Sequence, residues 1–283
     1  MTGELSRYCD MTWEDVERAA KDDRVVLVPV GTVEQHGPHL PVDTDNRIAE
    51  AFCTAAEQHC RENTCLVAPT VGFGLSQHLA DFPGAVFHTS HVFVDVLTEV
   101  FASYASSGFR RVLALNAHGS NVAPLDLATK EALHRHPGHQ FASVSWWELS
   151  DVRDVVARSG PPSQASHACA FETSIMLTSA PEMVRLDKVV PGQPYPDSAH
   201  VWRDLFGRRP EPTHRNPVRL TEMWSSWSDN GVRGDPRDAT AELGEAMLEA
   251  GGKELAAIID ELRGRPLRDA RRNDPPRHKE GEP

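Results

Sequence analysis

The chain has 283 residues, of which 40% are hydrophobic and 25% charged, the composition of an ordinary soluble globular protein. Its formal net charge of −12 argues against nonspecific nucleic-acid binding, which needs a basic surface, but leaves room for a local basic pocket. The five cysteines include no C-x-x-C pair, which favours reduced thiols and a cytoplasmic protein. We expect no signal peptide, and no membrane contact because no apolar run is long enough to span a bilayer.

Hydrophobic periodicity predicts strands that alternate with helices along the chain. Apolar runs predict strands over residues 25–30, 65–71, 110–116 and 141–147. Capping residues predict a short helix after Thr12 and a helix over residues 46–60 that Thr44 caps. Further helices are predicted over residues 91–106, 120–136, 165–179 and 240–263. This alternation predicts an α/β fold, a three-layer αβα sandwich with a mostly parallel central sheet.

The domain organisation is predicted to be simple. Residues 1–263 are expected to form a single domain. Within it, residues 191–235 are rich in proline, arginine and tryptophan and have weak periodicity, which predicts a lid over a site or an oligomer interface. Residues 264–283 are charged and contain proline, which predicts a disordered tail.

A polar loop, residues 31–46, follows the first predicted strand. Its sequence, GTVEQHGPHLPVDTDN, lies at the C-terminal end of the strand, where open α/β sheets place their ligand sites. Glu34 and His36 are two residues apart and face the same side in extended backbone, and Asp45 can return to the same place from the next helix. Nitrogen and oxygen donors without cysteine suit zinc, manganese or ferrous iron. The alternative is a polar loop whose histidines only bond neighbouring backbone.

This loop resembles the signature of the creatininase (creatinine amidohydrolase) family, G-[ST]-x-E-Q-H-G-P-H-L-P-x-x-T-D. Three further segments match at the family's spacings, namely Phe82–Gly84, Asn116–Asn121 and His167–Ser174. The resemblance covers about residues 24–260, nearly the whole chain. It implies an αβα fold, two divalent metal ions (zinc, manganese or iron), a small-molecule substrate and a homo-oligomer, often a hexamer.

The resemblance also implies a ligand set. Glu34 and His118 would bind one metal ion, His36 would bind the other, and Asp45 would bridge both; Asp43 is the alternative bridge, but the family's spacing favours the later aspartate. The residues themselves support His118, because it follows the third predicted strand and so reaches the same edge of the sheet.

One position departs from creatininase itself, which has a glutamate two residues after the histidine that matches His118. Here that residue is Ser120, which weakens the case for creatinine as the substrate. Glu172 is the candidate to complete the second metal site, because a glutamate next to Phe171 is costly to bury unless it is paired or coordinated. Its alternative role is to interact with the N-terminal end of its helix.

Further residues are candidates for catalysis and substrate contact. His167 lies near the start of the helix predicted to carry Glu172, and it matches a creatininase histidine thought to move protons, a role that imidazole suits near pH 7. Helix capping is the alternative. The predicted substrate contacts are Ser76, His78, Ser120 and Trp147, with a core position as the alternative for Trp147.

These residues predict metal-dependent hydrolysis. Two adjacent divalent ions lower the pKa of a water between them and polarise the carbonyl that the resulting hydroxide attacks, and His167 or Glu172 would protonate the departing nitrogen. We expect cleavage of a non-peptide or cyclic amide bond, as in a lactam, cyclic urea or formamide. The alternatives are a peptidase that trims a modified peptide precursor, a catalytically silent metal-binding scaffold, and a dinuclear phosphoesterase, for which Arg47 is the only nearby cation.

Overall fold

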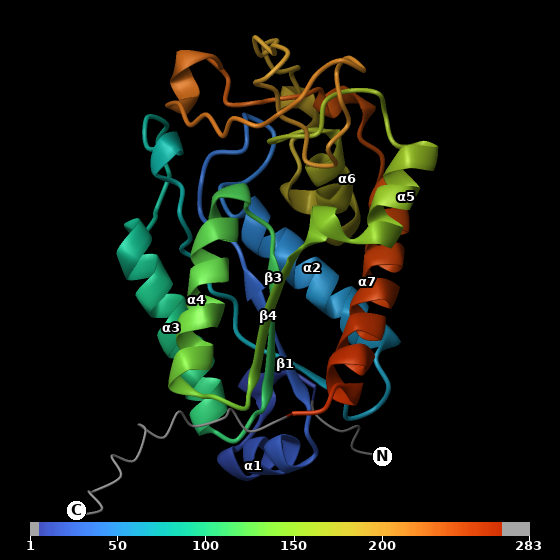
Figure 1. Ribbon diagram of the computed structural model, residues 1–283. Helices are drawn as coiled ribbons and strands as arrows, with labels where there is room; N and C mark the ends of the chain where they lie inside the picture. Colours follow the sequence, from blue (N-terminus) through green and yellow to red (C-terminus); the bar gives the residue numbers. More distant parts are fainter. Residues whose placement is uncertain (1–5, 268–283) are drawn as a thin grey trace, which may run out of the picture.

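The computed structural model describes residues 6–267 of the chain. Four parallel strands form its central sheet (Figure 1). The strand order is β2-β1-β3-β4, and every pairing is parallel. The strands are β1 (Val25–Val30), β2 (Cys65–Val67), β3 (Arg111–Asn116) and β4 (Gln140–Ser145). The predicted α/β fold with a parallel sheet is confirmed. The predicted tail lies outside the described residues from residue 268 on.

Helices cover both faces of the sheet. In Figure 1, α3 and α4 lie on one face, and α2, α5 and α7 lie on the other. The helices are α1 (Trp13–Lys21), α2 (Thr44–His59), α3 (Ser90–Ser106), α4 (Val122–Arg135), α5 (Ser150–Ser159), α6 (Ala170–Ser179) and α7 (Ala241–Gly264). No helix within residues 6–267 combines the length and apolarity of a bilayer span.

Strand β1 shows why the sheet is buried on both faces. Its side chains alternate between two hydrophobic clusters: Val25 and Leu27 pack with α2, α5 and α7, whereas Val26 and Val28 pack with α3 and α4. Since successive side chains of a strand point to opposite faces, a run of apolar residues suits a sheet covered on both sides. The polar residues that end the strands are therefore left at the edge of the sheet.

Several element boundaries differ from the predictions. Helix α2 begins at Thr44 itself, with Asp43 as the N-cap residue, because the Thr44 hydroxyl donates to the Pro41 carbonyl (2.7 Å) instead of capping the helix. Strand β2 ends at Val67. Strand β4 ends at Ser145, and Trp147 lies in the 3₁₀ turn that follows it.

The largest correction concerns the helix predicted over residues 165–179, which begins only at Ala170. Ala168 has a φ of +51°, a left-handed conformation that a helix does not tolerate. His167 is extended, and its backbone N–H and C=O both bond Arg233, at 3.1 and 2.9 Å. His167 is therefore in a loop and not in the helix that carries Glu172. Helix α5, which the sequence analysis did not predict, lies just before this loop.

Residues 191–235 are irregular, as predicted, and lie above the C-terminal ends of the strands (gold to orange in Figure 1). Two buried tryptophans make hydrogen bonds within this segment. Trp202 Nε1 donates to the Arg215 carbonyl (3.0 Å), and Trp224 Nε1 donates to the Gly231 carbonyl (2.8 Å). Its role as lid or interface, and the single domain over residues 1–263, stay predictions.

Candidate metal centre

The candidate site is built where loops meet at the C-terminal edge of the sheet. The loop after β1 supplies Glu34 and His36, the first turn of α2 supplies Asp45, the loop after β3 supplies His118, and the first turn of α6 supplies Glu172. All of these side chains are buried, with exposed fractions of 0 to 6%. Five polar residues from three separate segments of the chain thus meet in the interior.

Two potential ligand clusters share one carboxylate. Glu34, Asp45 and His118 form the first, and His36, Asp45 and Glu172 the second, with the donor atoms of each within 4.8 Å of one another. Asp45 Oδ1 lies 3.1 Å from His36 Nε2, and Asp45 Oδ2 lies 3.0 Å from His118 Nδ1. Each carboxylate oxygen of Asp45 therefore faces a different histidine, which is the arrangement of a bridging ligand.

In both His36 and His118, the ring nitrogen that points away from Asp45 lies near a backbone carbonyl. His36 Nδ1 lies 3.3 Å from the Glu34 carbonyl, and His118 Nε2 lies 3.1 Å from the Leu75 carbonyl. A proton on each of these nitrogens donates to the carbonyl and leaves the other ring nitrogen, the one that faces Asp45, with a free lone pair. Such backbone contacts orient histidines that bind metals.

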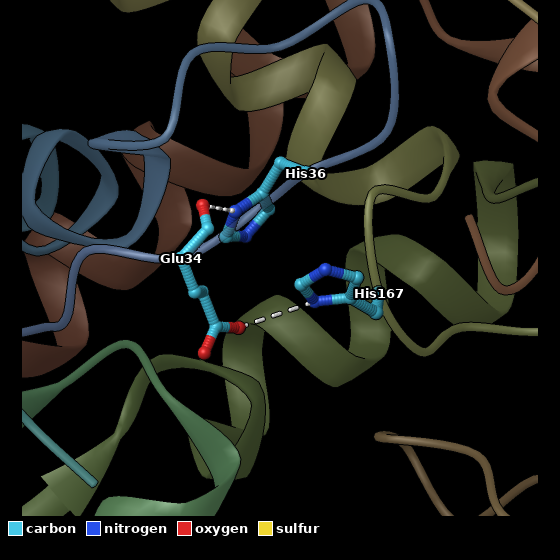
Figure 2. A group of neighbouring side chains, drawn as sticks. All are labelled: Glu34, His36 and His167. Atoms are coloured by element: carbon cyan, nitrogen blue, oxygen red, sulfur yellow. Dashed lines mark hydrogen bonds and ion pairs between the residues drawn. The ribbon is translucent and has the colours of Figure 1, made fainter. Parts of the chain in front are cut away.

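His167 forms a third group with Glu34 and His36 (Figure 2). Its Nδ1 lies 3.5 Å from Glu34 Oε1, and its ring centroid is 4.2 Å from that of His36. Its Nε2–H donates to the Gln35 carbonyl (2.6 Å). Burial, and then the charge of His36, lower the pKa of His167 well below its usual value, so the imidazole is neutral.

In the absence of a metal, protons take the place of a cation in the clusters. Burial opposes a charge on His36, but the Asp45 carboxylate outweighs burial and raises the pKa of His36 to about 9. The pKa of His118 is likewise raised, against burial, by Glu34 and Asp45. Burial raises the pKa of Glu172 to about 8. Histidines and carboxyl groups that carry such protons release them when a metal ion binds in their place.

The donor set fits a pair of metal ions. Apart from contacts with His118 and His167, both carboxylate oxygens of Glu34, Asp45 Oδ2 and Glu172 Oε2 are buried without a hydrogen-bond partner. Buried carboxylate oxygens without a partner are costly, and a divalent cation would satisfy them. Because every donor is nitrogen or oxygen, the set suits zinc, manganese or ferrous iron.

A cavity of about 450 Å³ opens over the clusters. Glu34, Asp45, His118, His167 and Glu172 line it, together with three predicted substrate contacts, His78, Ser120 and Trp147. Trp202 and Trp224 from residues 191–235 complete the aromatic walls.

Ser76, a predicted substrate contact, and Arg47, the cation considered for a phosphoesterase, lie outside the cavity. Ser76 does not line the cavity; it is fully buried, with its hydroxyl 3.3 Å from that of Thr32, so its expected contact with substrate has no support. Arg47 does not line the cavity either, and its guanidinium lies 3.3 Å from Asp43. The second imidazole of the signature loop, His39, bonds Thr173 Oγ1 on α6 (3.0 Å) outside the clusters.

Gln35 is a site residue that the sequence analysis missed. Its Nε2 lies 3.1 Å from His167 Nε2 and donates to the Gly231 carbonyl (3.0 Å), and its Oε1 accepts from the Gly37 N–H (2.8 Å). The signal was present, because Gln35 stands between Glu34 and His36 in the signature loop. The cavity residues of the irregular segment carried no such signal.

The fold and the site define an α/β protein with a buried carboxylate–histidine centre at the ends of its parallel strands, an arrangement that suits a metal-dependent hydrolase. The family model of creatininase, described as creatinine amidohydrolase, matches residues 9–259, so the chain belongs to the creatininase family.

Individual relatives agree with this assignment. The chain is 34% identical over 227 residues to the mycofactocin precursor peptide peptidase of Mycolicibacterium smegmatis, covering 79% of each protein. It is 28% identical over 269 residues to the creatinine amidohydrolase of Pseudomonas putida, covering 89% of this chain and 95% of that protein. A crystal structure of creatinine amidohydrolase superposes with a TM-score of 0.74 at 26% identity, covering 93% of this chain and 100% of the other. The resemblance found in the signature loop is confirmed.

Proposed function

We propose that the chain is a dinuclear metal-dependent amidohydrolase that cleaves a non-peptide or cyclic carbon–nitrogen amide bond, as in a lactam, cyclic urea or formamide. Membership of the family makes it a hydrolase of carbon–nitrogen bonds. The observation that carries the dinuclear proposal is the position of Asp45, whose two oxygens each face a different histidine in two clusters that share it.

The ligands follow from the clusters. Glu34, Asp45 and His118 would hold one ion, and His36, Asp45 and Glu172 the other. When bound, two divalent ions supply an acidified water and an electrophilic pull on the carbonyl oxygen. The Glu172 assignment accounts for the serine at position 120, since a carboxylate from α6 stands in the second cluster.

His167 is placed to move a proton. Its Nε2–H is held by the Gln35 carbonyl, so Nδ1, which faces Glu34 and the cavity, is the atom that can take up a proton and pass it to the departing nitrogen. Trp224 packs edge-on against this ring at 4.8 Å between centroids and limits its rotation. His78, Ser120 and Trp147 are the proposed substrate contacts in the same cavity.

A peptidase acting on a modified peptide precursor is the second candidate. It is favoured by the higher identity to the mycofactocin precursor peptide peptidase than to the creatinine amidohydrolase, 34% against 28%. The serine at position 120 argues only against creatinine as the substrate. A silent scaffold has less support, because no proposed ligand is missing from the clusters.

Metal content per chain tests the proposal. Elemental analysis should be made on protein purified without added metal or chelator, for wild type, Glu172→Gln and Asp43→Asn. We expect two ions in wild type, a fall toward one in Glu172→Gln, and no change in Asp43→Asn, whose carboxylate bonds Asn46 outside the clusters (2.7 Å). Wild-type protein that holds no tightly bound metal, even after zinc or manganese is added back, would rule out the proposal.

A substrate screen separates the two candidates. Lactams, cyclic ureas and formamides form one panel, and C-terminally modified peptides form the other. Turnover in the first panel alone supports the amidohydrolase, and turnover in the second alone supports the peptidase.

We also propose a cytoplasmic homo-oligomer, a hexamer by resemblance to the family. All five cysteines are free, as expected in a reducing compartment. Light scattering of the purified chain measures the assembly, and a monomer at micromolar concentration would contradict it.

A further inference from the structure

Two arginines line the cavity without a partner. Arg203 and Arg219, both from residues 191–235, face the same cavity as Glu34, Asp45 and Glu172. Within residues 6–267, neither guanidinium makes a hydrogen bond or an ion pair, although Arg203 is half-buried. An arginine fork has several donors, so a half-buried one without acceptors has capacity to bind a ligand.

The carboxylates nearest to Arg203 along the chain are engaged elsewhere. Asp204 also lines the cavity, but it accepts from the Arg208 guanidinium (2.9 Å) and from the backbone N–H groups of Ala165 and Phe206 (3.0 Å each). Asp197 lies 3.6 Å from the buried Arg233. The protein's own acids therefore do not neutralise Arg203.

The backbone around Arg203 is held in place. The preceding residue, Trp202, is buried and bonds the Arg215 carbonyl, and the Arg203 carbonyl accepts from Gln164 Nε2. The charge of Arg203 also reaches His78 across the cavity: burial, then the charges of His118 and Arg203, lower the pKa of His78 to about 4. The backbone of Arg203 is thus fixed in the wall of the cavity that the clusters also line.

We propose that the cavity selects substrates that carry an anionic group, a carboxylate or a phosphate, which Arg203 binds while the amide lies at the clusters. This inference rests on the proposed function and names its substrate class. The planar guanidinium matches either anion with paired hydrogen bonds, and the half-buried position of Arg203 strengthens such a pair. Arg219 is exposed and adds attraction at the rim. A small neutral lactam such as creatinine would leave Arg203 unpaired.

Tryptophan fluorescence can measure binding without turnover, because Trp147, Trp202 and Trp224 line the cavity. The probes are N-acetylglycylglycine, its C-terminal amide, and inorganic phosphate, each titrated into metal-loaded and chelator-treated protein. The variants are Arg203→Gln, Arg203→Lys, and the control Arg209→Gln, an exposed arginine of the same segment that does not line the cavity.

We expect the acid peptide to bind wild type more tightly than its amide. Arg203→Gln should weaken acid binding roughly 10- to 100-fold, the loss expected for one charge-assisted pair. Arg203→Lys should weaken it less, and Arg209→Gln should leave it unchanged. Phosphate binding that depends on Arg203, without binding of the peptide acid, would identify phosphate as the anion.

Other outcomes overturn the inference. The inference is wrong if the acid and the amide bind wild type equally, or if Arg203→Gln binds the acid as tightly as wild type does. It is also wrong if neither the peptide acid nor phosphate gives a saturable response. Binding that needs the metal and ignores Arg203 would mean that the ions hold the anion, so this inference fails while the proposed function stands. Binding in metal-free protein that depends on Arg203 supports the inference even if no metal-dependent hydrolysis is found.

Discussion

The carboxylate of Asp45 lies between two buried histidines because α2 begins at Thr44, within the last residues of the signature loop. Its position in the first turn of α2 turns the side chain toward the loop that precedes the helix. Asp43, two residues earlier, instead bonds Asn46 and lies 3.3 Å from Arg47. Two aspartates in one short stretch therefore have different environments, and only the later one faces both clusters.

Asp45→Asn should remove most of the bound metal and nearly all activity. An amide keeps the shape of the side chain but loses the negative charge that a bridging ligand supplies to two cations. Metal content by elemental analysis and turnover measure the effect, with Asp43→Asn as the matched control. Full metal content in Asp45→Asn would refute the bridging role.

His167→Asn should lower kcat about 10²- to 10⁴-fold, the usual contribution of a positioned acid–base group, with metal content unchanged. The asparagine retains polarity but cannot exchange a proton near neutral pH. Steady-state kinetics and elemental analysis on the same preparation measure both quantities. A loss of metal would instead make His167 a ligand, in keeping with its group with Glu34 and His36.

The residues that meet in the clusters could be named from the sequence chiefly because the signature loop and its spacings resemble the creatininase family, and the positions after predicted strands agree with that resemblance. Glu34, His36 and His118 come directly after apolar runs, and parallel strands bring such residues to one edge. Gln35 was overlooked although it stands in the same motif, because an amide does not suggest metal chemistry. Ser76 faces Thr32 and does not line the cavity, because a loop after a strand can turn a side chain either way.

At the level of elements, the loop before α6 decides where His167 lies. The sequence predicted a continuous helix because residues 165–179 are apolar at helical spacing. The structure differs at Ala168, whose positive φ nothing in its side chain predicts, and at the bridge between His167 and Arg233, which joins segments 66 residues apart. Local periodicity cannot predict pairing between segments so far apart in the sequence. This bridge connects the site to residues 191–235.

The variant Gly231→Ala tests the connection between residues 191–235 and the site. Gly231 has a φ of +80°, and an added Cβ would overlap Gln35 Oε1, so the Gln35 side chain, which contacts His167, must shift. We expect kcat to fall by up to about 100-fold, as for other small misplacements of catalytic groups, while metal content is retained.

The control for that change is Gly207→Ala. Gly207 also lies in residues 191–235 and has a φ of +71°, but its added Cβ meets nothing nearer than Arg153 Nη2 at 3.7 Å. Both alanines add backbone strain of about 1–2 kcal/mol, so only the contact with Gln35 differs. Similar kcat values in the two variants would show that strain alone causes the loss.

The irregular segment itself marks the limit of prediction from sequence. Its proline and tryptophan content indicated a lid or interface, but no period fixes which side chains point inward. Arg203 and Trp224 line the cavity and are held by hydrogen bonds that periodicity does not reveal, from Gln164 Nε2 to the Arg203 carbonyl and from Trp224 Nε1 to the Gly231 carbonyl.

For the whole molecule, the clusters concentrate buried charge in a protein that is otherwise stabilised by two apolar layers. Glu34, Asp45 and Glu172 are all at least 96% buried, and several of their oxygens lack hydrogen bonds. Their burial away from water opposes folding, whereas cations that bind only the folded chain favour it. Metal binding and global stability are therefore coupled through these three carboxylates.

Removal of metal should consequently lower the melting temperature. At a free metal concentration one hundred times Kd, binding adds about 2.7 kcal/mol of stability. With roughly 2–4 °C per kcal/mol for a domain of this size, the difference between metal-loaded and chelator-treated wild type should be about 5–10 °C. Differential scanning calorimetry measures it. Asp45→Asn should show little or no shift because its cluster holds less metal, whereas Asp43→Asn should show the wild-type shift. An equal shift in Asp45→Asn would place the stabilising metal outside the clusters.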